Sequence, residues 1–377
     1  MNRRNFLFCS CGAAFAGFAR LGGQGLSGQG LSGPGLVAQG QAPRRQITIG
    51  GRRVRTIDMH AHVFVQEAWP LVKDLPQADR AMANLGASAM AVDASGLERR
   101  FREMDRQGID VHVISVHPSQ FLYFTEPGLA ARIVRMQNER IAELCKAYPD
   151  RFVGFGNVSL QQPDLAVEQL DYAVKQLDLR GFIIGANVNG GELSNPRLDP
   201  FWKRAEELGT VISIHPQGFE DTGKRLDGAG ALGNNIGFPL DTTIALAHLI
   251  FEGHLDRFPG LRIIAAHGGG FLASYIGRYD NCNAIQAPCQ RMKRKPSDYL
   301  RGPQLYFDSL VYSPQNVRHL VTTAGASQIV IGTDFGFPIA SSTPVDTILQ
   351  TPGLTPEEQT AILGGNAARL LGLEARG

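Results

Sequence analysis

The chain has 377 residues, of which 43% are hydrophobic and 19% are charged, with a formal net charge of +2. This composition is that of an ordinary globular protein with enough length for one large domain. The small net charge argues against a nucleic-acid partner, which would require a concentrated basic surface. The apolar run near the N-terminus is too short for stable membrane insertion.

Residues 1–42 are predicted to be an export signal followed by a glycine-rich linker. Arg3 and Arg4 precede Asn5 and a short, weakly apolar run over 6–19, which resembles a twin-arginine signal. The glycine-rich tract that follows has no core-forming pattern. We therefore expect the protein to be periplasmic or secreted, with the twin-arginine (Tat) translocase as its partner during export. The alternative is a chance arginine pair on a disordered tail.

The cysteines beyond this segment are Cys145, Cys282 and Cys289, an odd number without metal-binding spacing. Three free thiols are the favoured interpretation. One bridge between Cys282 and Cys289 is the alternative in an oxidising compartment.

Apolar runs alternate with helical patterns along the rest of the chain. The runs lie at 56–62, 111–117, 152–160, 181–187, 211–216, 262–268, 305–311 and 328–335. Eight strands, each followed by a helix, are typical of a (β/α)₈ TIM barrel. We predict that 43–377 form a single metal-dependent catalytic domain of this α/β fold, with loop insertions at 65–96 and 217–238.

Two histidines, His60 and His62, end the first run in "IDMHAH". Strand side chains alternate, so both rings point to one side, where a metal would satisfy them. His215, His267 and Asp334 are predicted to end the fifth, sixth and eighth strands. Active sites of TIM barrels lie at this end of the strands, so these groups should meet in one site.

The remaining histidines are expected to be structural or solvent-facing. We interpret His112 as structural, because it lies early in the second strand. For His117, at the end of that strand, a hydrogen-bonded surface role is favoured over a place in the pocket. His248, His254 and His319 fall on helices and are expected to pack or face solvent.

The motifs "IDMHAHVF", "AHGGG" and "IGTDFGFP" together make the sequence similar to the amidohydrolase superfamily. The resemblance is to its aminocarboxymuconate-semialdehyde decarboxylase-like branch, and it covers nearly all of 55–340. It implies that His60, His62, His215 and Asp334 bind the metal and that His267 is catalytic. It also implies that Arg278 binds a substrate carboxylate in the site of a neighbouring subunit, which predicts a homodimer.

Three imidazoles and a carboxylate suit Zn²⁺, with Mn²⁺ or another divalent metal as the alternative. The fourth predicted strand ends in "IIGANVNG" without the lysine of binuclear relatives, so we expect one metal ion and no organic cofactor. His267 would serve as general base or carry a proton to carbon. Asp334 would both bind the metal and orient a water molecule, which gives it a catalytic role as well.

The favoured function is non-oxidative decarboxylation of an unsaturated or aromatic carboxylic acid. Hydrolysis of a lactone, amide or related bond is the alternative, and a non-catalytic metal-binding protein is a third. Gln217 in "HPQG" stands near the position where the namesake of the branch has a tryptophan, and we predict that it contacts substrate. Lys73 and Arg80 are further candidates. These departures predict a small carboxylate substrate different from that of the namesake.

Overall fold

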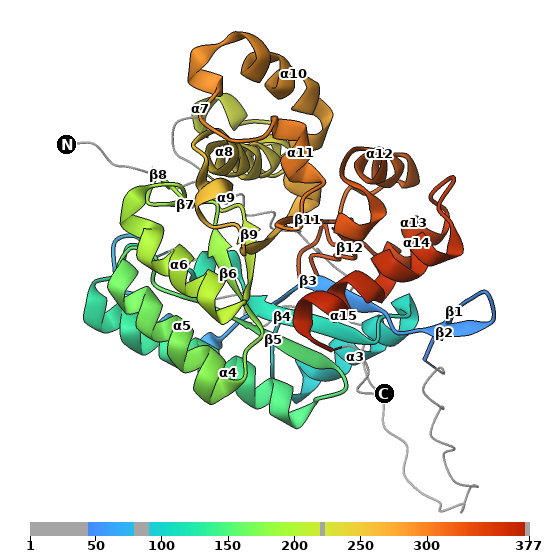
Figure 1. Ribbon diagram of the computed structural model, residues 1–377. Helices are drawn as coiled ribbons and strands as arrows, with labels where there is room; N and C mark the ends of the chain where they lie inside the picture. The colour runs from blue at the N-terminus through green and yellow to red at the C-terminus, as the bar shows by residue number, and fades with distance from the viewer. Residues whose placement is uncertain (1–43, 79–89, 219–222, 374–377) are drawn as a thin grey trace, which may run out of the picture.

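The structure is a computed structural model that describes residues 44–78, 90–218 and 223–373. The predicted signal and linker at 1–42 lie outside these residues. The described part forms one barrel, shown in Figure 1.

The centre of the fold is a parallel sheet of eight strands that follow one another in chain order. Bridges from Asp58 to Ile331 and from Ala61 to Phe335 join its first and last strands, which closes the barrel. The predicted (β/α)₈ fold is therefore confirmed. The strands are β3 (Ile57–Val63), β4 (Val111–Val116), β5 (Phe152–Gly156), β6 (Gly181–Gly185), β9 (Val211–His215), β10 (Arg262–Ala265), β11 (Leu305–Asp308) and β12 (Ile329–Val330).

Helices surround the strands on the outside (Figure 1). The long ones are α3 (Ala94–Gln107), α4 (Pro127–Ala147), α5 (Pro163–Leu177), α6 (Asp199–Leu208), α8 (Phe238–Phe251), α10 (Leu272–Ile285) and α12 (Pro314–Ala324). Their ends follow from local chemistry. In α3, for example, the Asp93 carboxylate accepts a hydrogen bond from the Gly96 amide, and Gly108 ends the helix in a left-handed conformation.

Shorter elements complete the fold. The helices are α1 (Trp69–Val72), α7 (Gly223–Leu226), α9 (His254–Arg257), α11 (Pro296–Leu300), α13 (Pro344–Leu349), α14 (Pro356–Thr360) and α15 (Asn366–Leu371). Two hairpins pair β1 (Ile47–Ile49) with β2 (Arg52–Val54) and β7 (Asn187–Val188) with β8 (Gly191–Glu192).

Several strands are shorter at their C-terminal ends than the sequence predicts. The third predicted run, at 152–160, forms β5 only as far as Gly156, yet Val158 and Leu160 beyond it are fully buried. The apolar pattern continues because the loops after the strands cover the barrel. Buried apolar residues in a loop therefore give the same sequence pattern as buried apolar residues in a hydrogen-bonded strand.

The barrel interior is closed at the N-terminal end of the strands. Interior side chains such as Met59, Val113 and Phe155 form one buried cluster with Leu370 and Leu371 of α15. This packing seals one end of the barrel, so a ligand can reach the interior only from the end where the strands terminate.

A disulfide joins Cys282 on α10 to Cys289 in the turn that follows it. The expectation of three free thiols is therefore wrong, and Cys145 alone remains free among the described residues. The pairing escaped prediction because spacing alone does not reveal it. The turn over Ala287–Cys289 brings the two Cα atoms to 5.8 Å, within the usual range for a bridge.

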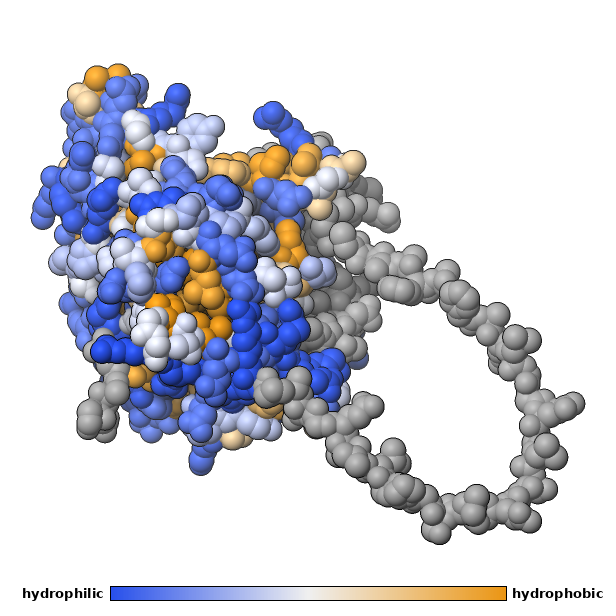
Figure 2. Space-filling view, turned by 90° about the vertical axis from the view of Figure 1, so that its right-hand side faces the viewer, coloured by the Kyte–Doolittle hydropathy of each residue, from blue (hydrophilic) through white to orange (hydrophobic). Residues whose placement is uncertain are grey.

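The face of the molecule in Figure 2 is mostly hydrophilic, with hydrophobic residues in small groups between polar ones. Among the described residues, no helix has the length and apolar character needed to cross a membrane.

Candidate metal centre

The two histidines of β3 lie together, as the alternation of strand side chains predicts. The Nε2 atoms of His60 and His62 are 3.0 Å apart, and both rings are buried. Asp334 lies beside them, with its Oδ1 atom 3.2 Å from His60 Nε2 and 3.1 Å from His62 Nε2. The ring of His215 is centred 5.1 Å from that of His60. The four predicted ligands therefore converge.

His267 belongs to the same cluster. Its Nε2 atom is 3.7 Å from Asp334 Oδ2, and its ring centre is 5.2 Å from that of His215. One donor atom each from His60, His215, His267 and Asp334 lie within 4.8 Å of one another, a spacing that a metal ion could bridge. His267 and Asp334 do not end strands as predicted. His267 lies two residues beyond β10 in a turn over His267–Gly269, and Asp334 lies four residues beyond β12.

Hydrogen bonds orient three of the rings toward the centre. The Nδ1 atom of His60 is 2.7 Å from Asp308 Oδ2, that of His62 is 3.2 Å from the Val116 carbonyl, and that of His215 is 2.7 Å from the Pro216 carbonyl. An acceptor at Nδ1 holds the proton there and leaves the lone pair on Nε2. Metal-binding histidines are commonly held by such partners.

The electrostatics of the centre favour neutral rings at His62 and His215 and an ionised Asp334, as metal binding requires. Burial lowers the pKa of His62 and, with the neighbouring rings, holds that of His215 well below its usual value. Burial opposes charge on His60 as well, but Asp334 and Asp308 outweigh it and raise its pKa to about 10. Despite burial, the nearby imidazoles hold the pKa of Asp334 well below its ordinary range.

His215 Nε2 and Asp334 Oδ1 are among the buried atoms that lack a hydrogen-bond partner within the described residues. Unpartnered buried polar atoms are costly, and a bound cation would satisfy both. The donor set of imidazole nitrogens and a carboxylate therefore fits a divalent metal.

Asp308 is a site residue that the sequence analysis missed. Its carboxylate accepts hydrogen bonds from the backbone amides of His267 and Gly268, in addition to its contact with His60. It ends β11, whereas the run predicted at 305–311 places it inside the strand, so the rule of strand ends did not single it out.

A second carboxylate that the sequence analysis missed is Asp58. It lies at the seam of the barrel, where the first strand, β3, meets the segment after the last strand, β12. It accepts hydrogen bonds from the amides of His60 and Thr333 and from the Thr333 hydroxyl. It thereby ties the strand that carries two histidines to the loop that carries Asp334. Burial raises the pKa of Asp58 to about 7.

The glycines after His267 are required by close packing. A Cβ atom on Gly270 would lie 2.0 Å from the Pro239 carbonyl oxygen, and its φ of +66° also disfavours other residues. A Cβ on Gly268 would lie 2.5 Å from Val311. The "HGGG" motif thus lets the turn that carries His267 approach α8 and the loop after β11.

The other histidines largely occupy the predicted places. His112 is buried 3.3 Å from Asp58, as expected for a structural residue. His254 is buried, His248 is partly buried, and His319 is exposed. The surface role favoured for His117 is wrong.

The ring of His117 is buried beside the site. It stacks on Phe337 with a centre separation of 4.7 Å and lies 6.3 Å from the His62 ring. Burial lowers its pKa to about 3, so it is neutral. The sequence places it at a strand end, but the loop that covers it could not be foreseen.

The predicted substrate-binding residues are more scattered. Gln217 is partly buried, and its amide donates a 2.6 Å hydrogen bond to the Asn187 carbonyl. Arg278 is exposed on α10, and Lys73 is exposed just after α1. Arg80 lies outside the described residues.

A pocket of about 360 Å³ opens onto the histidine cluster. His267 and Asp334 lie in its wall, together with Phe271, Leu310 and Tyr312. Its size and largely apolar wall suit a small organic molecule.

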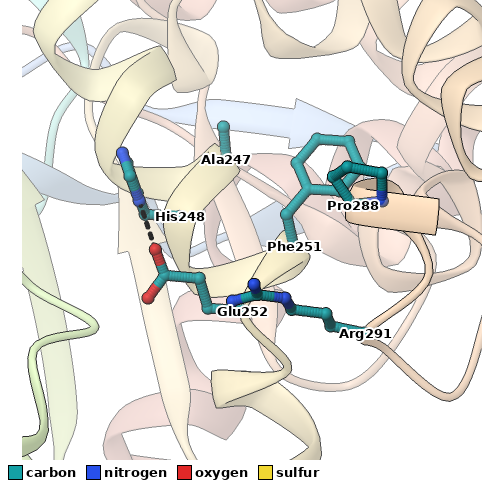
Figure 3. A pocket seen from close by; sticks show the side chains of 6 residues that line it. All are labelled: Ala247, His248, Phe251, Glu252, Pro288 and Arg291. Atoms are coloured by element: carbon teal, nitrogen blue, oxygen red, sulfur yellow. Dashed lines mark hydrogen bonds and ion pairs between the residues drawn. The ribbon is translucent and has the colours of Figure 1, made fainter. Parts of the chain in front are cut away.

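A smaller pocket, of about 230 Å³, lies on the outside of the barrel between α8 and the turn after α10 (Figure 3). His248 and Glu252 face each other there at 2.6 Å, opposite Arg291. It contains none of the clustered histidines, so we assign it no part in the chemistry.

Comparison with known proteins decides the family. A family model described as amidohydrolase matches residues 57–373. The chain belongs to the amidohydrolase family. The superfamily membership predicted from the motifs is confirmed.

Several relatives are decarboxylases. This amidohydrolase is 31% identical, over 277 residues, to a 2-amino-3-carboxymuconate-6-semialdehyde decarboxylase of Dictyostelium discoideum, covering 73% of this chain and 76% of the relative. It is 30% identical to a gamma-resorcylate decarboxylase of Rhodococcus jostii, covering 63% and 76% of the two chains.

A solved structure shares the fold. It is a dihydroxybenzoic acid decarboxylase from Polaromonas with bound manganese and an inhibitor, 2-nitroresorcinol. The TM-score is 0.72 at 23% identity, and the match covers 85% of this chain and 98% of that one.

Proposed function

We propose that this amidohydrolase is a metal-dependent decarboxylase that removes CO₂ from an aromatic or unsaturated carboxylic acid without oxidation. The observation that carries the proposal is the position of His267, which lies beside the predicted metal ligands and also in the wall of the apolar pocket. Relatives that act as decarboxylases support the same reaction class.

The ring contacts support different roles for the four histidines. His60, His62 and His215 each have a hydrogen-bond acceptor at Nδ1, as metal ligands commonly do. The Nδ1 atom of His267 is buried without a partner among the described residues. We therefore assign His60, His62, His215 and Asp334 as ligands and His267 as the proton-transferring residue.

The chemistry follows from this arrangement. A divalent cation at the centre would supply Lewis-acid polarisation of a substrate oxygen. His267 would deliver a proton from Nε2 to the carbon that bears the carboxylate. The bond from this carbon to the carboxylate then breaks, CO₂ leaves, and its electron pair restores the unsaturated system.

We propose Zn²⁺ as the ion, because three imidazoles and one carboxylate are usual zinc ligands. Mn²⁺ is the alternative, and the fold neighbour with bound manganese gives it weight. Metal analysis of protein purified without added metal tests the choice, with about one equivalent expected for a single four-ligand site.

The activity is tested with metal-loaded protein and a series of aromatic and unsaturated carboxylic acids. Release of CO₂ in equal amount to the decarboxylated product supports the proposal. A product that has gained water without loss of CO₂ supports the alternative hydrolase instead. Binding of metal without turnover of any acid, ester, lactone or amide would contradict both.

We also propose export to the periplasm or cell exterior through the twin-arginine signal. The disulfide between Cys282 and Cys289 supports this location, because disulfides are rare in reducing cytosol. Changing Arg3 and Arg4 to lysine should leave the precursor in the cytoplasm, as judged by cell fractionation. Unchanged delivery of this variant would reject the signal.

Finally, we propose a homodimer in which Arg278 reaches the partner's site. Arg278 lies six residues into α10, roughly 9 Å along this helix from Leu272, and it is exposed and does not line the pocket of its own chain. The same helix exposes Tyr275 and Ile285, with 59% and 66% of their surfaces accessible. A guanidinium there could bind a substrate carboxylate through two hydrogen bonds.

Complementation tests this arrangement. Arg278→Ala and His267→Ala proteins should each be inactive, and mixing them should restore part of the activity through hybrid dimers with one intact site. Each variant mixed with itself is the control. Mixtures that stay inactive after proven subunit exchange would place Arg278 outside the partner's site.

A further inference from the structure

Three residues in the wall of the site pocket share an unusual backbone conformation. His267, Tyr312 and Asp334 have φ angles of +55°, +60° and +59°. A side chain in this left-handed region costs energy, and such positions concentrate where function requires them. His267 and Asp334 already have roles in the proposed reaction, whereas Tyr312 has none.

Tyr312 is held in a tightly folded loop after β11. The amide of Val311 donates to the Ser309 carbonyl, and that of Ser313 donates to the Val311 carbonyl, both at 2.8 Å. These two bonds fold the chain on either side of the tyrosine. The loop directs Tyr312 into the pocket lined by His267 and Asp334.

The phenol is available to a ligand. Tyr312 is 52% exposed, and its hydroxyl has no hydrogen-bond partner within the part of the chain that the structure describes. Burial of the ring, together with Asp334 and Asp308, raises the pKa of Tyr312. The hydroxyl therefore keeps its proton at neutral pH and can donate it in a hydrogen bond.

The rest of the wall suits a ring. Phe271, Leu310 and Val311 supply apolar surface around the tyrosine. A planar substrate that lies on this surface, with its carboxylate toward the histidine cluster, would bring the substituents next to the carboxylate within reach of the pocket wall.

We propose that Tyr312 is a specificity-determining residue that donates a hydrogen bond to an oxygen substituent on the substrate ring. This inference rests on the proposed decarboxylase function. It predicts a preference for acids with a ring hydroxyl over otherwise identical acids without one.

The test compares wild type with Tyr312→Phe, which keeps the ring and the left-handed backbone. The probes are gamma-resorcylate, salicylate and benzoate, which differ only in ring hydroxyl groups. For the hydroxylated acids we expect about tenfold weaker binding in the variant, measured as KM where turnover occurs and as Kd by calorimetry on metal-loaded protein. Benzoate binding should change less than about twofold, because it has no hydroxyl to lose a partner.

Tyr148→Phe is the matched control, because this tyrosine at the end of α4 is 37% exposed and does not line the pocket. It should leave all three probes unchanged. If each acid binds wild type and Tyr312→Phe with the same affinity, the proposed role of Tyr312 is overturned. The proposed decarboxylase function, which is tested by CO₂ release, is not affected by that result. Absence of CO₂ release from every acid would instead contradict the proposed function, and the calorimetric comparison would still decide the role of Tyr312.

Discussion

Replacing His60 and His62 together with alanine is expected to abolish metal binding and all turnover. The two rings supply half of the predicted ligands. Loss of a residue that merely orients a ligand already weakens metal affinity about 10–100-fold, so loss of two ligands should exceed that. Metal content after dialysis against a weak chelator measures the effect.

The double variant also removes the His60 ring that contacts both Asp308 and Asp334, so its folding must be checked by circular dichroism. His215→Ala provides a second variant, since His215 is held neutral and its loss strands no charge. His248→Ala removes a partly buried histidine outside the cluster and is the control. Full metal occupancy in both site variants would refute the centre.

Changing His267 to asparagine is expected to lower kcat by about 10²–10⁴, the usual contribution of general acid–base catalysis. Metal content should stay near one equivalent, because the other three histidines and Asp334 remain. Substrate KM should change little if His267 acts mainly by proton transfer. Steady-state kinetics and metal analysis on the same preparation measure all three quantities.

The same variant separates the two possible roles of this residue. The compact geometry of His60, His215, His267 and Asp334 would also allow His267 to bind the metal in place of His62. Loss of metal from His267→Asn, with metal retained in His62→Asn, would show that the roles are exchanged.

The sequence predicted the barrel and the convergence of His60, His62, His215 and Asp334. These predictions succeed because the period of two in strands and the common end of parallel strands are set by backbone geometry alone. His62 and Asp334 meet although they are far apart in the sequence, because the closed sheet brings the first and last strands together.

The features that escaped prediction depend on loops. His117 is buried because Phe337 stacks on it, and Tyr312 enters the pocket because its backbone turns left-handed. Neither effect has a periodic signal in the sequence. Asp308 escaped prediction because the apolar run continues to 311, although the strand itself ends at Asp308.

The seam between Asp58 and Thr333 has a consequence for the order of events during synthesis. These residues are 275 positions apart, and the first and last of the proposed ligands, His60 and Asp334, lie next to them in the chain. A growing chain cannot present the whole ligand set until nearly nine-tenths of it has been made. Such distant pairing is among the slow steps of folding. We therefore expect metal loading to follow completion of the chain, and the bound ion to mark molecules whose barrel has closed.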